Sequence, residues 1–371
     1  MSQYPIEEIR LTDPRGLAAA DALLAREGIR RDAHLDYLCG MYDDTGELIG
    51  TGGCFGETLR CFAVSGEHQG EGLLNEIITH LVQVQASRGR THLYLYTKEQ
   101  TGKFFRDLGF YEIARVSGTL VFMENRRRGF EDYLARLRKE TESAMAGMEP
   151  PAGRGTAAGR IGAVVMNANP FTLGHQYLAE TAAADCDLLH LFLLSEDASL
   201  VPYKIRRRLA EAGTAHLPNV ILHDSGPYII SSATFPSYFL KEENAVIEGH
   251  ARLDLAVFAR IAQALGITDR YVGEEPFSRV TGIYNQLMTE QLPAAGIRCH
   301  VIPRKVIGEK GQDLPEGSGI ISASAVREAL KTGDRKTLQA MLPESSLAYF
   351  DSPEAAAVLE RIRGAGETAH Y

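Results

Sequence analysis

The sequence predicts an α/β protein in which a first α/β domain precedes a doubly wound parallel sheet. Strand-like and helix-like segments alternate along residues 160–350, which is the pattern of a parallel sheet covered by helices. Residues 1–125 also mix the two patterns. A Gly-, Ala- and Pro-rich stretch at 144–160 separates the two regions and is interpreted as a linker. The 371 residues are enough for two such domains.

In the first domain, residues 47–65 have the alternation of strands interrupted by glycine turns. Apolar residues then recur three and four positions apart over 73–89, which predicts a helix. Residues 91–97 alternate as a strand, and 101–113 have the order of a helix, a glycine stop and a strand. The first domain is therefore expected over residues 1–125.

A further helix is expected directly after this domain, over residues 126–140, because Phe130, Tyr133, Leu134 and Leu137 recur at helical spacing. It closes the first domain or bridges the two domains, and its basic start is interpreted as a solvated face. The predicted organisation is completed by the remaining segments, namely a helix and linker over 126–159, the second domain over 160–350 and a tail over 351–371.

Composition and charge exclude several classes of protein. Hydrophobic residues make up 44% and charged residues 23%, as in ordinary globular proteins. The net charge is −9, which argues against a general nucleic-acid or acidic-membrane binder. The five cysteines include no CxxC pair, so no zinc site or disulfide framework is expected. No apolar run reaches the length of a membrane span and the N-terminus is no signal peptide, so a cytoplasmic protein is expected.

The loop before the helix at 73–89 has the form expected of a phosphate-binding turn. Gln69 and Gly72 lie where backbone N–H groups at a helix start can hold a pyrophosphate. The order of strand, Q-x-x-G, helix, strand and "FFRDLGF" resembles the GCN5-related acetyltransferase family, in which this loop holds the pyrophosphate of coenzyme A. The sequence departs from that pattern at its last position, where Leu74 replaces Gly or Ala.

In the second domain, ligands are expected beyond the carboxyl ends of the strands. Strands are predicted over five segments, 161–168, 188–195, 220–226, 270–275 and 298–304. The first strand leads into "NANPFTLGH", residues 167–175. There Gly174 permits close approach to the backbone, while Thr172 and His175 add a hydroxyl and an imidazole at a helix start that attracts anions. The alternative is that Thr172 only caps the helix and His175 is an ordinary histidine.

A second segment, "GIISASAVREAL" at 319–330, favours phosphate binding over a plain helix cap. Ser322 and Ser324 can cap the helix and offer hydroxyl groups, and Arg327 follows within its first turns. A capping box does not explain an arginine at this position, whereas a phosphate partner does.

Together the two segments resemble the HxGH nucleotidyltransferase superfamily. The resemblance implies that Thr172 and His175 contact phosphates near the reacting α-phosphorus, and that Ser322, Ser324 and Arg327 hold the β and γ phosphates of ATP. Asn167 and Gly174 are expected to line the same nucleotide site.

The pairing of these two domains, with the segments "SEDASLVPYKIRRRL", "GPYIISSATFPSYFLK" and "YVGEEPFSRVTGIYNQLM", resembles the citrate lyase ligase family over about residues 5–350. The resemblance implies an AMP-forming acid–thiol ligase. Acetate and ATP, with Mg²⁺, would give acetyl adenylate, and the acetyl group would pass to the prosthetic-group thiol of the citrate lyase acyl carrier subunit. No protein ligand for the metal is expected.

Other site residues are expected with open alternatives. Arg206 is either an ATP ligand or a solvated helix charge, and Gly273 either lets adenine lie against the backbone or makes a turn. Tyr228, Ser231 and Thr234 are candidates for the acid pocket, with a packed loop as the alternative.

Two rival functions remain open at this point. A nucleotide adenylyltransferase acting on a phosphate would leave the first domain without a role. A non-catalytic ATP-binding regulator would use the first domain for docking.

Overall fold

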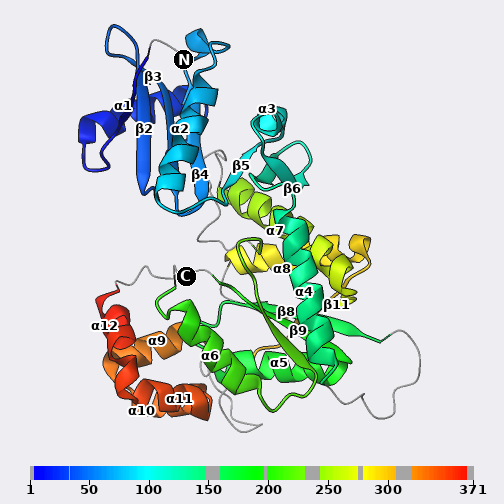
Figure 1. The fold of residues 1–371 in the computed structure, drawn as a ribbon. Helices are drawn as coiled ribbons and strands as arrows, with labels where there is room; N and C mark the ends of the chain where they lie inside the picture. The colour runs from blue at the N-terminus through cyan, green and yellow to red at the C-terminus, as the bar shows by residue number, and fades with distance from the viewer. Residues whose placement is uncertain are drawn as a thin grey trace. The chain divides into compact units, whose positions relative to one another are not determined.

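The computed structural model describes residues 4–32, 34–147, 159–195, 199–229, 243–274, 279–305 and 320–365. The chain divides into two compact units, which are treated separately below (Figure 1). The first unit comprises Met1–Asp132 with Phe235–Ala256, and the second comprises Tyr133–Thr234 with Val257–Tyr371. Helix α4, Gly129–Met145, therefore belongs largely to the second unit.

The first unit is built on a seven-stranded mixed sheet in the order β1-β2-β3-β4-β5-β7-β6. All neighbouring strands are antiparallel except β4 and β5, which run parallel and pair only at Thr58–Tyr94 and Leu59–Leu95. The expected α/β architecture of this region is confirmed. Its strands and helices are β1 Ile6–Glu8, α1 Pro14–Arg26, β2 Tyr37–Tyr42, β3 Leu48–Phe55, β4 Thr58–Val64, α2 Leu73–Ser87, β5 Tyr94–Lys98, α3 Gly102–Asp107, β6 Tyr111–Val116 and β7 Leu120–Glu124.

Helix α2 packs closely on β3 because the strand carries glycines where the helix crosses it. A Cβ atom at Gly52 would lie 2.6 Å from the Ile77 side chain, and one at Gly50 would lie 2.9 Å from it. Ile77 and Leu81 are fully buried in this contact. The glycine-rich sequence of β3 thus serves packing rather than only turns, and it fixes the distance between helix and sheet.

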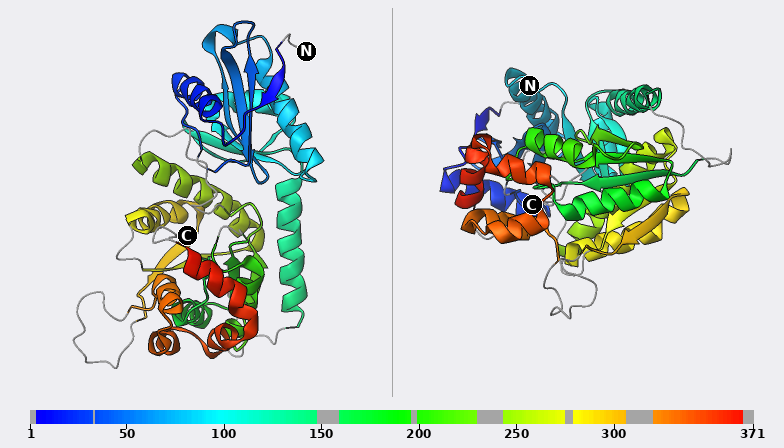
Figure 2. Two further views of the ribbon diagram at one scale, coloured as in Figure 1. Left: turned by 90° about the vertical axis from the view of Figure 1, so that its left-hand side faces the viewer. Right: turned by 90° about the horizontal axis from the view of Figure 1, so that it is seen from below.

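The second unit contains a five-stranded parallel sheet in the order β10-β9-β8-β11-β12. This is the predicted doubly wound sheet, and the strand order reverses at β8 (Figures 1 and 2). A reversal of this kind opens a crevice beyond the carboxyl ends of the strands. Its strands and helices are β8 Ile161–Met166, α5 Leu173–Asp185, β9 Leu188–Leu193, α6 Tyr203–Thr214, β10 Val220–Asp224, β11 Asp269–Gly273, α8 Arg279–Gln291, β12 Arg298–Ile302, α9 Ala323–Thr332, α10 Arg335–Met341, α11 Glu344–Asp351 and α12 Ala356–Gly364. Helix α7, Glu243–Leu265, is divided between the units, and its residues from Val257 onward belong to the second unit.

One face of this sheet packs against α5, α6 and the C-terminal helices α9 to α12, which lie together (Figure 2). Gly213 on α6 makes the fit possible, because a Cβ atom there would overlap the buried Phe171 ring. The segment interpreted as a tail contains α12, and its Val358 and Ile362 lie in this core. The four-residue spacing of these two side chains places them on one face of the helix.

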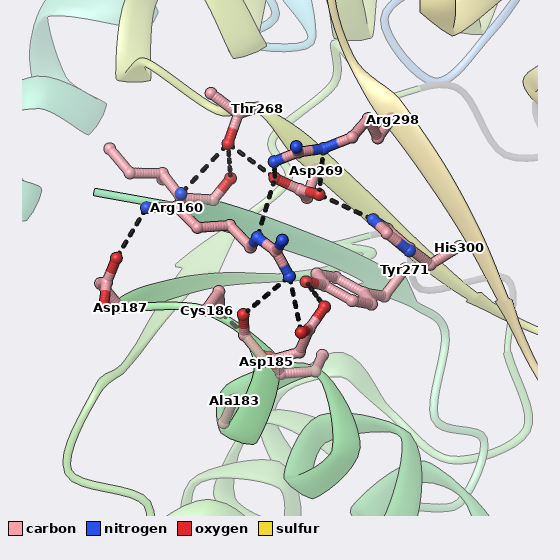
Figure 3. A network of polar contacts seen from close by, with 12 residues as sticks. Arg160, Ala183, Asp185, Cys186, Asp187, Thr268, Asp269, Tyr271, Arg298 and His300 are labelled. Atoms are coloured by element: carbon pink, nitrogen blue, oxygen red, sulfur yellow. Dashed lines mark hydrogen bonds and ion pairs between the residues drawn. The ribbon is translucent and has the colours of Figure 1, made fainter. Parts of the chain in front are cut away.

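The amino ends of the strands are tied together by a polar network around Asp269 (Figure 3). Asp269 is fully buried and accepts hydrogen bonds from Arg298 at 2.8 and 2.7 Å and from Thr268 at 2.7 Å, and it pairs with His300 at 2.7 Å. Burial alone would raise the pKa of Asp269, but these hydrogen bonds outweigh it and hold the pKa at about 2. The network therefore joins the starts of β11 and β12 through a carboxylate that is charged at neutral pH.

A second buried polar chain links α4 to the sheet. Glu140 on α4 lies 2.9 Å from His223 Nδ1 on β10, and His223 Nε2 lies 2.9 Å from His190 Nδ1 on β9. Because the carboxylate only accepts, His223 donates from Nδ1 and accepts at Nε2, so His190 donates from Nδ1. His190 Nε2 is then a buried acceptor, and none of the described residues donates a hydrogen bond to it.

Within the described part of the chain, no helix is both long and apolar enough to cross a membrane.

Candidate active site

The loop that follows β8 lies at the switch point of the second sheet and leads directly into α5. Thr172 is the N-cap residue of α5, and its hydroxyl accepts from the His175 backbone N–H at 3.4 Å. The side chain of His175 reaches back to the cap, because its Nδ1 lies 3.1 Å from the Thr172 backbone N–H and 2.9 Å from the Thr172 hydroxyl. The two residues thus form a reciprocal capping box with histidine in the usual place of glutamate.

This capping box determines which nitrogen of the neutral His175 ring carries the proton. Nδ1 accepts the Thr172 backbone N–H, so in the neutral ring the proton resides on Nε2. Burial, reinforced by the positive charge of Arg304, lowers the pKa of His175 to about 4. At neutral pH the half-buried imidazole, stacked on Phe171, is therefore an uncharged Nε2–H donor beside the N-terminus of α5.

The second predicted segment forms the N-terminus of α9. Ser322 is its N-cap and accepts from the Ala325 backbone N–H at 3.1 Å. Arg327 donates to the Asn169 carbonyl oxygen at 2.7 Å and to the Ser324 hydroxyl at 3.0 Å. Arg327 is only 8% exposed, and neither of these partners carries a charge. Burial lowers the pKa of Arg327, but an arginine remains charged at neutral pH, so this site has a positive charge to offer an anion.

The two segments lie against each other although more than 140 residues separate them along the chain. An ideal Cβ atom on Gly174 would lie 3.3 Å from the carbonyl oxygen of Ile321, directly before the N-cap of α9. The bond from Arg327 to the Asn169 carbonyl joins α9 to the loop that follows β8. The starts of α5 and α9 therefore lie close together, and each is a helix N-terminus of the kind that attracts anions.

Arg206 on α6 supports this loop from inside the protein. Its guanidinium is fully buried and donates to the carbonyl oxygens of Val201, Asn167 and Leu194 at 3.0, 2.8 and 2.7 Å. It also donates to the Asn167 side-chain oxygen at 3.0 Å. The alternative of a solvated helix charge is thus wrong, because Arg206 ties the carboxyl ends of β8 and β9 together.

The remaining predicted residues of the second unit are placed as follows. Gly273 ends β11 at the same carboxyl edge, and among the described residues no atom lies within 4 Å of an added Cβ. Tyr228 follows β10 but is only 3% exposed, and its ring packs on Tyr133 at 4.7 Å between centroids. Ser231 and Thr234 lie outside the described residues.

Gln69 and Gly72 belong to the first unit, at the N-terminus of α2. Gly72 is the N-cap with a φ of 83°, so the loop has the glycine backbone that a phosphate turn uses. Its surroundings are acidic, because Gln69 bonds to Glu27 at 3.3 Å and Glu71 pairs with His68 at 3.1 Å. These carboxylates weigh against a diphosphate at this loop, and a role for Gln69 and Gly72 in holding the thiol arm stays a prediction.

Arg304 and Lys305 were not predicted as site residues. They follow β12 at the carboxyl edge, and the Ile321 backbone N–H donates to the Lys305 carbonyl oxygen at 3.3 Å. Arg304 is the last residue of the strand predicted over 298–304 and Lys305 follows it, and this position at a carboxyl end of the second sheet is the signal that could have identified them.

Comparisons with known proteins show the family of this chain. Residues 161–350 match the citrate lyase ligase C-terminal domain. A [citrate [pro-3S]-lyase] ligase from Escherichia coli is 40% identical over 308 residues, covering 82% of this chain and 82% of that protein. One from Haemophilus influenzae is 36% identical over 345 residues, covering 91% and 96%. The chain belongs to the citrate lyase ligase family.

Solved structures were matched over about a third of the chain. A putative acyl-CoA N-acyltransferase from Klebsiella pneumoniae is 19% identical with a TM-score of 0.29, covering 33% of this chain and 96% of that one. Escherichia coli ElaA is 12% identical with a TM-score of 0.30, covering 33% and 100%. Family membership itself rests on the full-length relatives.

Proposed function

We propose that the protein is an ATP-dependent acetate:citrate lyase ligase, which forms acetyl adenylate and then acetylates the prosthetic-group thiol of the citrate lyase acyl carrier subunit. The observation that supports this most is the buried Arg327, held by uncharged partners where the starts of α5 and α9 converge. This arrangement suits the triphosphate of ATP. Family membership favours the ligase over a nucleotide adenylyltransferase or a non-catalytic regulator.

In the first step, an acetate oxygen attacks the α-phosphorus and the bond to the β-phosphate oxygen breaks, its electron pair leaving with pyrophosphate. Acetate is already ionised at neutral pH, so no base is required. The barrier comes from bringing two anions together and from the charge that builds on pyrophosphate. The His175 Nε2–H would donate to an α-phosphate oxygen, where a neutral donor avoids trapping the acetate anion.

Arg327, with the hydroxyls of Ser322 and Ser324, would hold the β and γ phosphates at the start of α9. Thr172 is only 1% exposed and its hydroxyl contacts His175, so its role is to position the imidazole. Arg206 has a similar positioning role for the loop at Asn167. Gly273 leaves open space at the same edge, where adenine would lie against the backbone.

Magnesium would enter this site with the phosphates. Among the residues the structure describes, no group of three or more His, Cys, Asp or Glu could hold a metal ion. Phosphate oxygens and water suit Mg²⁺ as ligands, and the bound ion would neutralise phosphate charge.

In the second step, the thiol sulfur attacks the acetyl carbonyl carbon and the bond to the AMP oxygen breaks, releasing AMP and the thiol proton. The position of the thiol arm on the second unit is left open by this proposal. Tyr228 is 3% exposed and packs on Tyr133, so this proposal gives it a packing role rather than a direct contact with acetate.

The test is ATP–pyrophosphate exchange with the purified full-length chain. Exchange that requires acetate, followed by a mass gain of one acetyl group on the carrier subunit, is the expected result. Exchange that requires a nucleotide or phosphopantetheine instead of acetate would support the adenylyltransferase. No exchange with any acid, despite measurable ATP binding, would support the regulator.

A further inference from the structure

The segment after β12 begins at the same edge of the sheet as the loop that follows β8. Strands β11 and β12 run parallel with Gly273 opposite Ile302, and the Glu274 backbone N–H donates to the Ile302 carbonyl oxygen at 2.8 Å. The two strands therefore end together. The chain then continues through Arg304 and Lys305, at the carboxyl edge where ligands of such sheets bind.

A short series of contacts connects this segment to the starts of α5 and α9. The Lys305 carbonyl oxygen accepts from the Ile321 N–H at 3.3 Å, and Ile321 is the residue whose own carbonyl lies against Gly174. The Lys305 ammonium lies 5.6 Å from the ring centre of Tyr177, in the second turn of α5. Lys305 therefore contacts Ile321, the residue before the N-cap of α9, and lies near Tyr177 in the second turn of α5.

Arg304 is held in this position by the main chain. Its Nε donates to the Glu274 carbonyl oxygen at 2.7 Å, which anchors one edge of the guanidinium to the end of β11. The positive charge of Arg304 is close enough to His175 to contribute to the low pKa of that ring. Arg304, Arg327 and two helix N-termini therefore gather positive charge at one edge, an arrangement that a bound polyanion stabilises.

We propose that Arg304 is a further catalytic residue of the adenylation step and binds the phosphates on the α–β side, next to His175. Its guanidinium stabilises the negative charge that builds on pyrophosphate as the bond from the α-phosphorus to the bridging oxygen breaks. No proton is transferred in this step. Lys305 acts as a positioning residue, because its backbone holds Ile321 at the start of α9. This inference rests on the proposed function and extends it to a residue outside the two motifs.

The experiment uses the full-length chain with Arg304→Gln and Arg304→Lys, and Arg298→Gln as the matched control. Arg298 lies on the same strand, but at its opposite end in the Asp269 network. Two readouts are measured, acetate-dependent ATP–pyrophosphate exchange and the binding of inorganic pyrophosphate by calorimetry. The second readout needs no acid substrate, so it separates failure of this inference from failure of the proposed function.

For Arg304→Gln we expect the exchange rate to fall about 100-fold and pyrophosphate binding to weaken about tenfold or more. Arg304→Lys should recover part of both, because a charge remains while the guanidinium fork is lost. Arg298→Gln should lower the melting temperature and keep both functions. The inference is overturned if pyrophosphate binding by Arg304→Gln stays within twofold of the unsubstituted chain, or if Arg298→Gln loses binding equally. If acetate-dependent exchange is absent from the unsubstituted chain but Arg304→Gln still weakens pyrophosphate binding, the anion site stands and the ligase proposal fails.

Discussion

At the scale of single residues, the Thr172–His175 capping box determines which ring nitrogen of His175 carries the proton and can donate a hydrogen bond. Nδ1 is occupied by the Thr172 backbone N–H, so Nε2–H is what the ring can offer a ligand. An ordinary cap would need only Thr172, whereas here the residue in the position of the usual glutamate is an imidazole. The same contacts thus cap the helix and set the hydrogen-bonding state of the ring on which the proposed chemistry depends.

Replacing His175 by Ala is expected to lower acetate-dependent exchange by about 100- to 1,000-fold, because one preorganised donor to the α-phosphate is lost. His175→Gln retains a side-chain N–H at similar reach and should recover part of the rate. His216→Ala is the control, because His216 is an exposed histidine of the same unit that pairs with Glu180 at 3.0 Å. Exchange within about threefold of normal in folded His175→Ala would make this histidine structural only.

Arg327→Lys is expected to raise the KM for ATP and to lower the exchange rate at low ATP. A guanidinium can bond Asn169, Ser324 and phosphate oxygens at once, and lysine cannot reproduce this fork. The matched control is Arg335→Lys on the exposed surface of α10, where the arginine pairs with Asp351. Initial rates over a range of ATP concentrations measure the effect, and unchanged kinetics at low ATP would remove Arg327 from the site.

At the scale of elements, two buried histidines between α4 and the sheet make the stability of the fold depend on pH. His190 is fully buried, and desolvation, reinforced by the neighbouring His223, lowers its pKa to about 3. Burial also lowers the pKa of His223, although Glu140 opposes this. Both rings are thus neutral in the folded protein at neutral pH. An unfolded chain would take up protons near pH 6.5, so stability is complete above that pH and is lost as the pH falls below it.

The free energy of unfolding is therefore expected to fall below about pH 6.5, by up to about 1.4 kcal/mol per pH unit for His190. In His190→Asn, the side-chain amide can still donate to His223, but the titrating ring is gone. This variant should show a shallower loss between pH 6.5 and pH 5. Denaturant unfolding at several pH values measures this difference, and parallel pH profiles would show that His190 does not contribute.

The sequence predicts an element well when the residues that determine it are close together along the chain. The starts of α5 and α9 are recognisable because small residues and hydroxyls precede an apolar period, and this is a local pattern. The inward direction of Arg206 was missed, although its spacing from Leu209, Ala210 and Gly213 places it on the buried face of α6. Its role depends on carbonyl groups from two different strands, and no local pattern contains that information.

At the scale of the whole molecule, the alternation of strand-like and helix-like segments along residues 160–350 predicted the parallel sheet, because parallel neighbouring strands need a crossover connection, which is usually a helix. The place of α4 was left open between closing the first domain and bridging the two. Three of its contacts lie within the second unit, from Tyr133 to Tyr228, from Arg138 to the Ala264 carbonyl oxygen, and from Glu140 to His223. These partners are more than 80 residues away, beyond the reach of periodicity.

A chain that begins at Gly129 is therefore expected to be more stable than one that begins at Arg160. The shorter chain loses α4, including the fully buried Leu137, and leaves His223 without its carboxylate. The expected loss is about 3 kcal/mol or more. Circular dichroism during heating compares the two. Equal melting temperatures would mean that α4 contributes nothing to the second unit, and exchange assays on both chains report whether the site survives.

The polar network around Asp269 has a consequence for how substitutions would be tolerated in a cell. This network joins the beginnings of the strands, whereas His175, Arg304 and Arg327 lie near their ends. In a library of all single variants, those at the strand beginnings should reduce the amount of protein that accumulates. Those beyond the strand ends should leave abundance normal and remove only growth that depends on the proposed ligase activity. Scoring abundance and growth separately would thus sort residues by which end of the same strands they occupy.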